Sequence, residues 1–462
     1  MKNSARKSAR ALQSSQTRDS LQALESQRTP RLEIVLIAAL LLAFLPALAL
    51  GQVTVQPFSL TGDGKDGEAE ANWTDSSCSS DCVSDESCGL GLTKVHYEFP
   101  SSGNFCSGDY SKSGDVHFKK IKAGSNDAPT SNSSGCNFDN VLADLHGNHC
   151  CVYYPLGAAS YDNTSCDFDT TLEGANLTVG DGSVFLQHVE YSLSKSSNTL
   201  SGSVPVTFSQ GGVYAVAPVL YGFEAKYGDD HHVEKMSFST GQAQGFSDGT
   251  AEVELEGEIK VKDDGSNSAN ASDSWLRATV IGLSDAGDAF PTDAEDSSDQ
   301  VRAPLLAVLE VTRDGDLDCV LMASKYNDVM DGENASGGSD CTSDTSYETT
   351  IDDDGQITLT LTDLTGSTQV ASTTSTFVNG VDLHFNNNDH HVKKVSFTTG
   401  GSVTIGDRSL DPTYDTCTQT IQFTPSLDMD DRNGNHAHGD STLDVVLLVF
   451  FENAETDCQD LS

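Results

Sequence analysis

One short motif that carries metal-binding and proton-transferring side chains occurs twice in the chain. An Asp-His-His triplet stands at residues 230–232, within DDHHVEKMSFSTG, and again at residues 389–391, within NDHHVKKVSFTTG. Imidazole nitrogens with carboxylate oxygens are typical ligands of zinc and other transition metals, whereas carboxylates with carbonyl oxygens suit calcium. The repeated motif is therefore the first candidate site.

Three interpretations of the Asp-His-His motif are open. In the first, Asp230 and Asp389 hold a turn through local backbone hydrogen bonds, and one imidazole bonds a carbonyl at the rim of the fold. In the second, the motif binds a metal ion. In the third, the histidines are catalytic, but no Ser or Cys nucleophile recurs beside them and no paired glutamates stand out. The first interpretation is favoured, and the metal site comes second.

The residues after each motif alternate as a strand does. Met236 and Phe238, like Val395 and Phe397, are predicted to share the core face. The two adjacent histidines then point to opposite faces, unless a β-bulge intervenes. In the metal interpretation, one imidazole and the preceding aspartate bind the ion, and the acidic pairs at 263–264 and 430–431 supply further oxygens. The candidate metal ligands are Asp230, His231, His232, Asp263, Asp264, Asp389, His390, His391, Asp430 and Asp431. Calcium is the expected ion, with zinc second.

Two other acidic segments resemble calcium loops. The segment DMDDRNGNHAHGD at 428–440 fits the spacing of such a loop imperfectly. The segment TIDDDGQITLTL at 350–361 has Thr350 and Leu361 where an EF-hand requires ligands. A hairpin turn is the favoured interpretation of the second segment.

The Asp-His-His motifs belong to a longer internal repeat. Landmarks recur in the same order, and their alignment places Asp263 and Asp264 opposite Asp430 and Asp431. The matched landmarks are Cys151 with Cys319, Cys166 with Cys341, GDGSVFL (180–186) with DDGQITL (353–359), and 262–282 with 429–449. The segment DVHFKKI (115–121) shares the pattern D-x-H-φ-x-K-φ, where φ is apolar, and is either a degenerate third copy or a chance match.

Apolar residues alternate or form short runs between Gly, Asn, Asp and Ser clusters, a pattern typical of strands. The stretch 305–324 predicts two strands around an Asp-Gly turn. We therefore predict an all-β protein of two tandem antiparallel β-sandwich or jelly-roll units, at 136–300 and 301–458, each around its own core. A Cys-rich segment, 52–135, precedes them.

The N-terminal region predicts export. Residues 34–51 are continuously apolar and follow a basic stretch, so residues 1–51 are interpreted as a signal peptide, or as an uncleaved anchor. An exported chain with 12 cysteines is expected to form disulfides. The pairs predicted first are Cys151–Cys166, Cys319–Cys341 and Cys417–Cys458.

The chain is strongly acidic, with 69 Asp and Glu against 26 Lys and Arg and a net charge of −43. Such a surface excludes nucleic acid as a partner and attracts divalent cations. A membrane contact is expected only if the N-terminal segment remains attached.

The sequence predicts a secreted or cell-surface binding, adhesion or structural protein, not an enzyme, which binds an extracellular protein or glycan. Two alternatives remain. One is an exported metal-dependent hydrolase that uses the Asp-His-His clusters. The other is a carbohydrate-binding module with aromatic platforms such as Trp275 or Tyr221.

Overall fold

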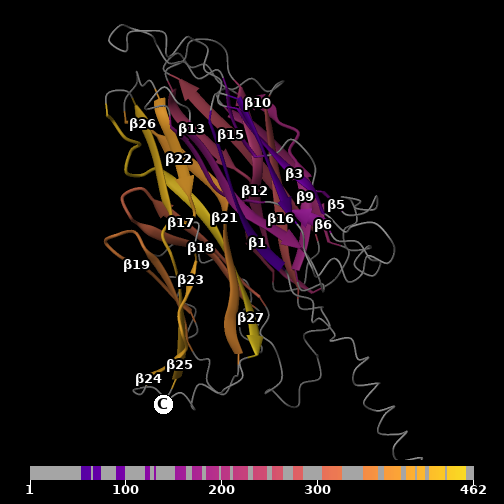
Figure 1. The fold of residues 1–462 in the computed structure, drawn as a ribbon, viewed down its shortest axis with the longest axis vertical. Helices are drawn as coiled ribbons and strands as arrows, with labels where there is room; N and C mark the ends of the chain where they lie inside the picture. The colour runs from indigo at the N-terminus through magenta and orange to yellow at the C-terminus, as the bar shows by residue number, and fades with distance from the viewer. Residues whose placement is uncertain are drawn as a thin grey trace, which may run out of the picture. The chain divides into compact units, whose positions relative to one another are not determined.

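The computed structural model describes twenty-one stretches of the chain. These are residues 54–63, 66–73, 90–98, 120–124, 130–131, 151–153, 155–162, 169–178, 184–196, 199–208, 212–226, 233–246, 252–263, 274–284, 304–324, 347–362, 369–386, 392–400, 403–411, 416–431 and 434–453. Within them every regular element is a β-strand, and every strand pairing is antiparallel (Figure 1). The predicted all-β, sandwich-like class is confirmed. None of these residues belongs to a helix that is long and apolar enough to cross a membrane.

Residues 54–284 supply sixteen strands. They are β1 (Thr54–Asp63), β2 (Asp66–Trp73), β3 (Leu90–Glu98), β4 (Lys120–Gly124), β5 (Thr130–Ser131), β6 (Cys151–Tyr153), β7 (Leu156–Asp162), β8 (Asp169–Thr178), β9 (Val184–Glu190), β10 (Ser194–Ser196), β11 (Thr199–Thr207), β12 (Val213–Lys226), β13 (Val233–Ser239), β14 (Gln244–Gly245), β15 (Glu252–Asp263) and β16 (Trp275–Ser284).

Residues 305–453 supply eleven strands. They are β17 (Leu305–Thr312), β18 (Leu317–Ser324), β19 (Tyr347–Ile351), β20 (Ile357–Leu361), β21 (Gln369–His384), β22 (Val392–Thr398), β23 (Thr404–Ile405), β24 (Ser409–Asp411), β25 (Thr416–Phe423), β26 (Ser426–Asp431) and β27 (Thr442–Asn453).

Both predicted hairpin turns are present. Strands β17 and β18 pair around Gly315, whose φ of 94° is the positive value that the Asp-Gly turn required. Strands β19 and β20 pair around Gly355, with a φ of 78°. The Asp352 carboxylate accepts hydrogen bonds from the backbone N–H groups of Asp354 and Gln356, at 3.0 and 2.9 Å. The acidic segment at 350–361 is therefore a hairpin.

Strands from both predicted units share sheets. One sheet has the order β10-β11-β15-β13-β21-β27-β17-β18, and a second has β2-β3-β4-β12-β16-β9. A third has β26-β22-β7-β8-β6-β5, with β1 also on β8, and a fourth has β19-β20-β25-β23, with β24 on β25. The expectation of a separate interior for each unit is therefore not met, although the boundaries at 136, 301 and 458 stay a prediction.

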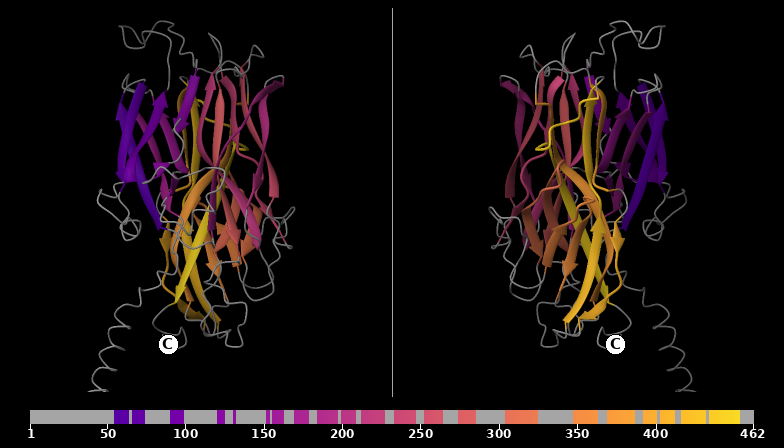
Figure 2. Two further views of the ribbon diagram at one scale, coloured as in Figure 1. Left: turned by 90° about the vertical axis from the view of Figure 1, so that its right-hand side faces the viewer. Right: turned by 90° about the vertical axis from the view of Figure 1, so that its left-hand side faces the viewer.

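Three antiparallel pairings join strands that are far apart in the sequence, and Figure 2 shows orange and yellow strands beside indigo and magenta ones. Strand β4 pairs with β12, β13 with β21, and β22 with β7, over five residue pairs each. Each pairing begins at the lysine of a D-x-H-φ-x-K-φ segment. The opening pairs are Lys120 with Lys226, Lys235 with His384, and Lys394 with Asp162. The common register favours DVHFKKI as a third copy of the motif.

The strands that follow the two Asp-His-His motifs have equivalent surroundings. Strand β13 pairs with β15 and β22 with β26, and both pairings contain a register shift immediately after the valine of the motif. Val233 lies opposite Asp263, and Val392 lies opposite Asp431. The structural counterpart of Asp263 is thus Asp431, one residue away from the partner that the sequence alignment gave it.

The cysteine landmarks do not occupy equivalent places. Cys151 begins β6, which pairs with β5 and β8, whereas Cys319 lies in β18, which pairs only with β17 among the described strands. Cys319 and Cys417 are both disulfide-bonded. Their predicted partners, Cys341 and Cys458, and also Cys166, lie outside the described residues, so the three pairings stay predictions.

The core is continuous between the two predicted units. Met236 and Phe238 of β13 lie in one apolar cluster with Val381 and Leu383 of β21. Val395 and Phe397 of β22 belong to the same cluster, which confirms the predicted core face of both motif strands. Strands β17 and β27 bury both faces, because their alternate residues enter a second cluster that β9, β12 and β16 complete.

A buried asparagine joins the two predicted units at a β-bulge of β21. Asn379 falls at a register shift between β21 and β27, and its side chain is only 4% exposed. The Asn379 amide donates to the carbonyls of Pro218 and Gly241, at 2.6 and 3.0 Å. The backbone carbonyl of Asn379 accepts hydrogen bonds from the backbone N–H and the hydroxyl of Thr240, at 3.2 and 2.7 Å.

Replacing Asn379 by Ala is expected to lower the free energy of unfolding by about 3 kcal/mol, because two buried carbonyls lose their donor. Chemical denaturation measures this change. The exposed Asn386 serves as the control, since Asn386→Ala is expected to shift stability by less than about 0.5 kcal/mol. Equal effects of the two substitutions would contradict the assignment of Asn379 as a structural link.

Candidate metal centre

The segment 434–441, which leads into β27, is fixed against the end of β21 and the β17–β18 hairpin. The His438 N–H donates to the His384 carbonyl at 2.7 Å, and the Asp314 N–H donates to the Gly439 carbonyl at 3.1 Å. A Cβ on Gly439 would collide with the Asp314 carboxylate, so Gly439 allows the Asp314 side chain to lie against this segment. The side chains of this segment therefore have a defined position relative to β21.

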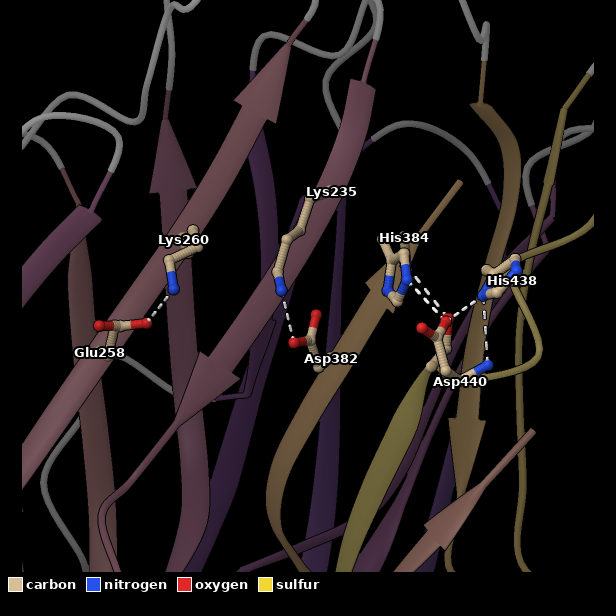
Figure 3. A network of polar contacts seen from close by, with 8 residues as sticks. Lys235, Glu258, Lys260, Asp382, His384, His438 and Asp440 are labelled. Carbon is tan, nitrogen blue, oxygen red and sulfur yellow. Dashed lines mark hydrogen bonds and ion pairs between the residues drawn. The ribbon is translucent and has the colours of Figure 1, made fainter. Parts of the chain in front are cut away.

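His384, His438 and Asp440 form the first group of potential metal ligands (Figure 3). His384 Nε2 lies 2.7 Å from Asp440 Oδ1, and His438 Nδ1 contacts the same oxygen. The two imidazole rings lie 5.5 Å apart between centroids. All three donor atoms are within 4.8 Å of one another, so small movements of the side chains would bring them around a single ion.

Asp440 supplies an ionised carboxylate at the open side of this group. A hydrogen bond with His438, assisted by the charges of His384 and His438, lowers the pKa of the Asp440 carboxyl, so the carboxylate is ionised at neutral pH. The Asp440 side chain is 66% exposed, and the His384 and His438 side chains are 25% and 35% exposed. The group is thus anchored on one side and open to solvent on the other.

Asp428, Asp430 and His436 form a second group with the same ligand spacing. His436 Nδ1 contacts Asp430 Oδ1 and lies 3.4 Å from Asp428 Oδ2. Arg313 Nε lies 3.2 Å from the other oxygen of Asp428. The Arg313 guanidinium and the His436 imidazole therefore already contact the carboxylates of this second group.

The two carboxyl groups of the second group ionise differently. Burial opposes ionisation of Asp428, but its hydrogen bond with Asp430 and the charge of Arg313 outweigh burial and lower the pKa of Asp428. Burial, together with the hydrogen bond and the charge of Asp428, raises the pKa of Asp430. Arg313 already compensates the negative charge of Asp428 in this pair. The first group is therefore the stronger candidate for a metal ion.

Asp431 belongs to neither group. Its side chain is fully buried and accepts hydrogen bonds from the Asn435 backbone N–H and from Asn435 Nδ2, both at 2.7 Å. The Asp431 N–H donates to the Asn435 carbonyl at 2.9 Å. Asp431 therefore holds the turn that carries the two ligand groups.

Among the predicted ligands, only Asp430 and Asp431 have described side chains, and the two play different parts. Asp263 ends β15, and its side chain lies outside the described residues. The others, which also lie outside them, are Asp230, His231, His232, Asp264, Asp389, His390 and His391. The predicted convergence around the Asp-His-His motifs thus stays a prediction.

Sequence reasoning missed the histidines of the first group, although part of the signal was present. His436, His438 and Asp440 alternate along the chain, as do Asp428 and Asp430. Alternate residues of an extended chain share a face. His384 comes from another strand, so no local pattern could have predicted its approach to Asp440.

The aromatic residues considered for carbohydrate binding are differently placed. Tyr221 lies within β12 and is fully buried, so its ring offers no platform at the surface. Trp275 lies in β16, with Arg277 stacked 4.9 Å from its ring centroid and its indole N–H donating to Glu224 at 2.9 Å. Neither residue is in a loop.

No family model matches the chain, and neither a curated protein nor a solved structure matches it. Function must therefore be argued from the described side chains alone.

Replacing Asp431 by Ala is expected to lower the free energy of unfolding by about 2 kcal/mol, because the Asn435 donors lose a buried charged acceptor. Asp431→Asn is the matched control, since an amide oxygen keeps one of the two hydrogen bonds and should cost less. Urea denaturation of both variants measures the difference. An alanine variant as stable as the parent would show that Asp431 does not hold the turn.

Proposed function

We propose that the chain is a secreted or cell-surface binding or structural protein in which a divalent metal ion at His384, His438 and Asp440 fixes the 434–441 loop. The observation that carries this proposal is the convergence of both imidazoles on one Asp440 oxygen. Since the loop enters β27 directly, an ion at this point would connect it to the end of β21. The acidic surface and the β-rich core are consistent with an extracellular scaffold.

The donor set favours a transition metal over calcium. Two imidazoles and one carboxylate suit zinc, nickel or cobalt, whereas calcium prefers oxygen ligands throughout. For this site, the preferred ion is therefore zinc, in the reverse of the order expected from the sequence.

The exposed side of the group supports a binding role for the ion. Three protein ligands leave at least one tetrahedral position of zinc for water or for a donor from a partner. Asp440, the most exposed of the three, faces solvent. A carboxylate or imidazole of an extracellular protein is the kind of partner group that such a position accepts.

A metal-dependent hydrolase is the alternative function that this open position also supports, because catalytic zinc sites have the same number of protein ligands. The two functions differ in turnover. The binding proposal predicts no hydrolysis of ester, phosphoester or peptide substrates by the zinc-loaded protein, and metal-dependent hydrolysis abolished in His384→Ala would replace it.

Zinc added to metal-free protein is expected to raise the melting temperature. At a zinc concentration 100 times the Kd, the stabilisation should be about 2.7 kcal/mol. His438→Ala and Asp440→Asn are expected to remove this shift, because each deletes one of three ligands. Differential scanning calorimetry and isothermal titration with zinc chloride measure both effects.

His436→Ala is the matched control, since it removes a nearby histidine that belongs only to the second group. This variant should retain the zinc-dependent shift. If His436→Ala loses the shift while His438→Ala keeps it, the ion binds at Asp428 and Asp430 instead. A parent protein that is indifferent to zinc would refute the metal centre.

A further inference from the structure

A row of carboxylates crosses one face of the β18–β17–β27–β21 part of the sheet. Asp318 lies opposite Glu310, and Glu310 lies opposite Asp444. On β21, Gly380 lies opposite Asp444, and Asp382 is the next residue on the same face. None of these four acidic residues belongs to the metal groups described above.

Gly380 on the neighbouring strand β21 makes room for the Asp444 carboxylate. A Cβ on residue 380 would lie 2.8 Å from Asp444 Oδ2, so the glycine lets the Asp444 carboxylate lie over β21. Asp444 Oδ1 and Asp382 Oδ1 are both buried atoms without a hydrogen-bond partner among the described residues. The row therefore contains two buried carboxylate oxygens that accept no hydrogen bond from the described residues. Native folds seldom leave buried acceptors without a partner.

The negative charge of the row is poorly compensated. Lys235 Nζ lies 2.5 Å from Asp382 Oδ2 and neutralises that end (Figure 3). Burial, then the charge of Glu310 and a hydrogen bond with it, and the charge of Asp382, raise the pKa of Asp444 to about 7. Burial and the charges of Asp318 and Asp382 also raise the pKa of Glu310.

We propose that Glu310 and Asp444, flanked by Asp318 and Asp382, bind a calcium ion on this face of the sheet. All the side-chain donors of the row are carboxylate oxygens, the ligands that calcium prefers. Asp318 is exposed, whereas Glu310, Asp382 and Asp444 are partly buried, so the row is open to solvent at its Asp318 end, where water would complete the coordination of the ion. This calcium site uses residues separate from the proposed zinc site and does not depend on it.

The contribution of Asp444 to the stability of calcium-free protein should fall as the pH rises from about 4 to 7. The folded-state pKa of Asp444 is raised above its unfolded value, so the folded chain holds a proton that the unfolded chain has lost, and the resulting stability disappears above pH 7. Asp444→Asn is neutral at every pH and should show a smaller fall. Melting curves at successive pH values compare the two proteins.

The calcium proposal is tested in full-length, chelator-treated protein that carries His384→Ala and His438→Ala, which remove the first metal group. Titration calorimetry with calcium chloride at pH 8 is expected to show one calcium ion fewer in Asp444→Asn, or at least tenfold weaker binding of one ion. Glu310→Gln should behave in the same way. Affinity should also weaken from pH 8 to pH 6, because the ion displaces a proton.

Glu254→Gln is the matched control, since Glu254 is an exposed carboxylate on β15 outside the row. It should bind calcium as the background protein does. Melting temperatures in calcium-free buffer verify that each variant is folded. The proposal is overturned if the background protein binds no calcium at about 10 mM, above the range of extracellular calcium modules. It also fails if Asp444→Asn and Glu310→Gln bind calcium as Glu254→Gln does.

Discussion

The fold depends on three short strands that each complete a sheet belonging to another part of the chain. Strands β4, β13 and β22 pair with β12, β21 and β7. The last pairing joins β22, from the C-terminal part of the chain, to β7, which comes more than 200 residues earlier. A strand edge left unpaired exposes its N–H and C=O groups and invites aggregation. The backbone hydrogen bonds of each of these strands are therefore satisfied only when it pairs with its distant partner, and Asn379 adds a buried side-chain link beside the pairing of β13 with β21.

The polar sites lie where apolar packing between the sheets ends. On one face of β27, Leu448 and Val446 belong to the second apolar cluster, and the next residues on that face are Asp444, Thr442 and then Asp440 before the strand. The same change occurs along β21, from Phe377 to Asp382 and His384. Carboxylates and imidazoles at such a border are partly desolvated, which strengthens their interaction with cations, yet they remain accessible to ions from solvent.

Sequence reasoning predicted the features that depend on local chemistry. The alternation around Met236 and Phe238, and the glycine turns at Gly315 and Gly355, follow from side-chain periodicity and from backbone sterics. It failed where the answer depends on distant strands. The alignment paired Asp263 with Asp430, but the register pairs it with Asp431, because only the pairing with a neighbouring strand reveals which residues are equivalent. The contact of His384 with Asp440 joins residues that no local pattern relates.

The equivalent positions also distinguish the junction that carries the proposed zinc site from the other two among the described residues. Opposite the lysines that open the three junctions stand Lys226, His384 and Asp162, so among these three partner positions only that of β13 carries an imidazole. Lys262 stands opposite Lys235 where Asp430 stands opposite Lys394, so the second ligand group has no counterpart beside β13 either. The repeat therefore supplies a rigid strand framework common to its copies, and the chemistry comes from the 434–441 loop and from one histidine that the framework happens to place beside it.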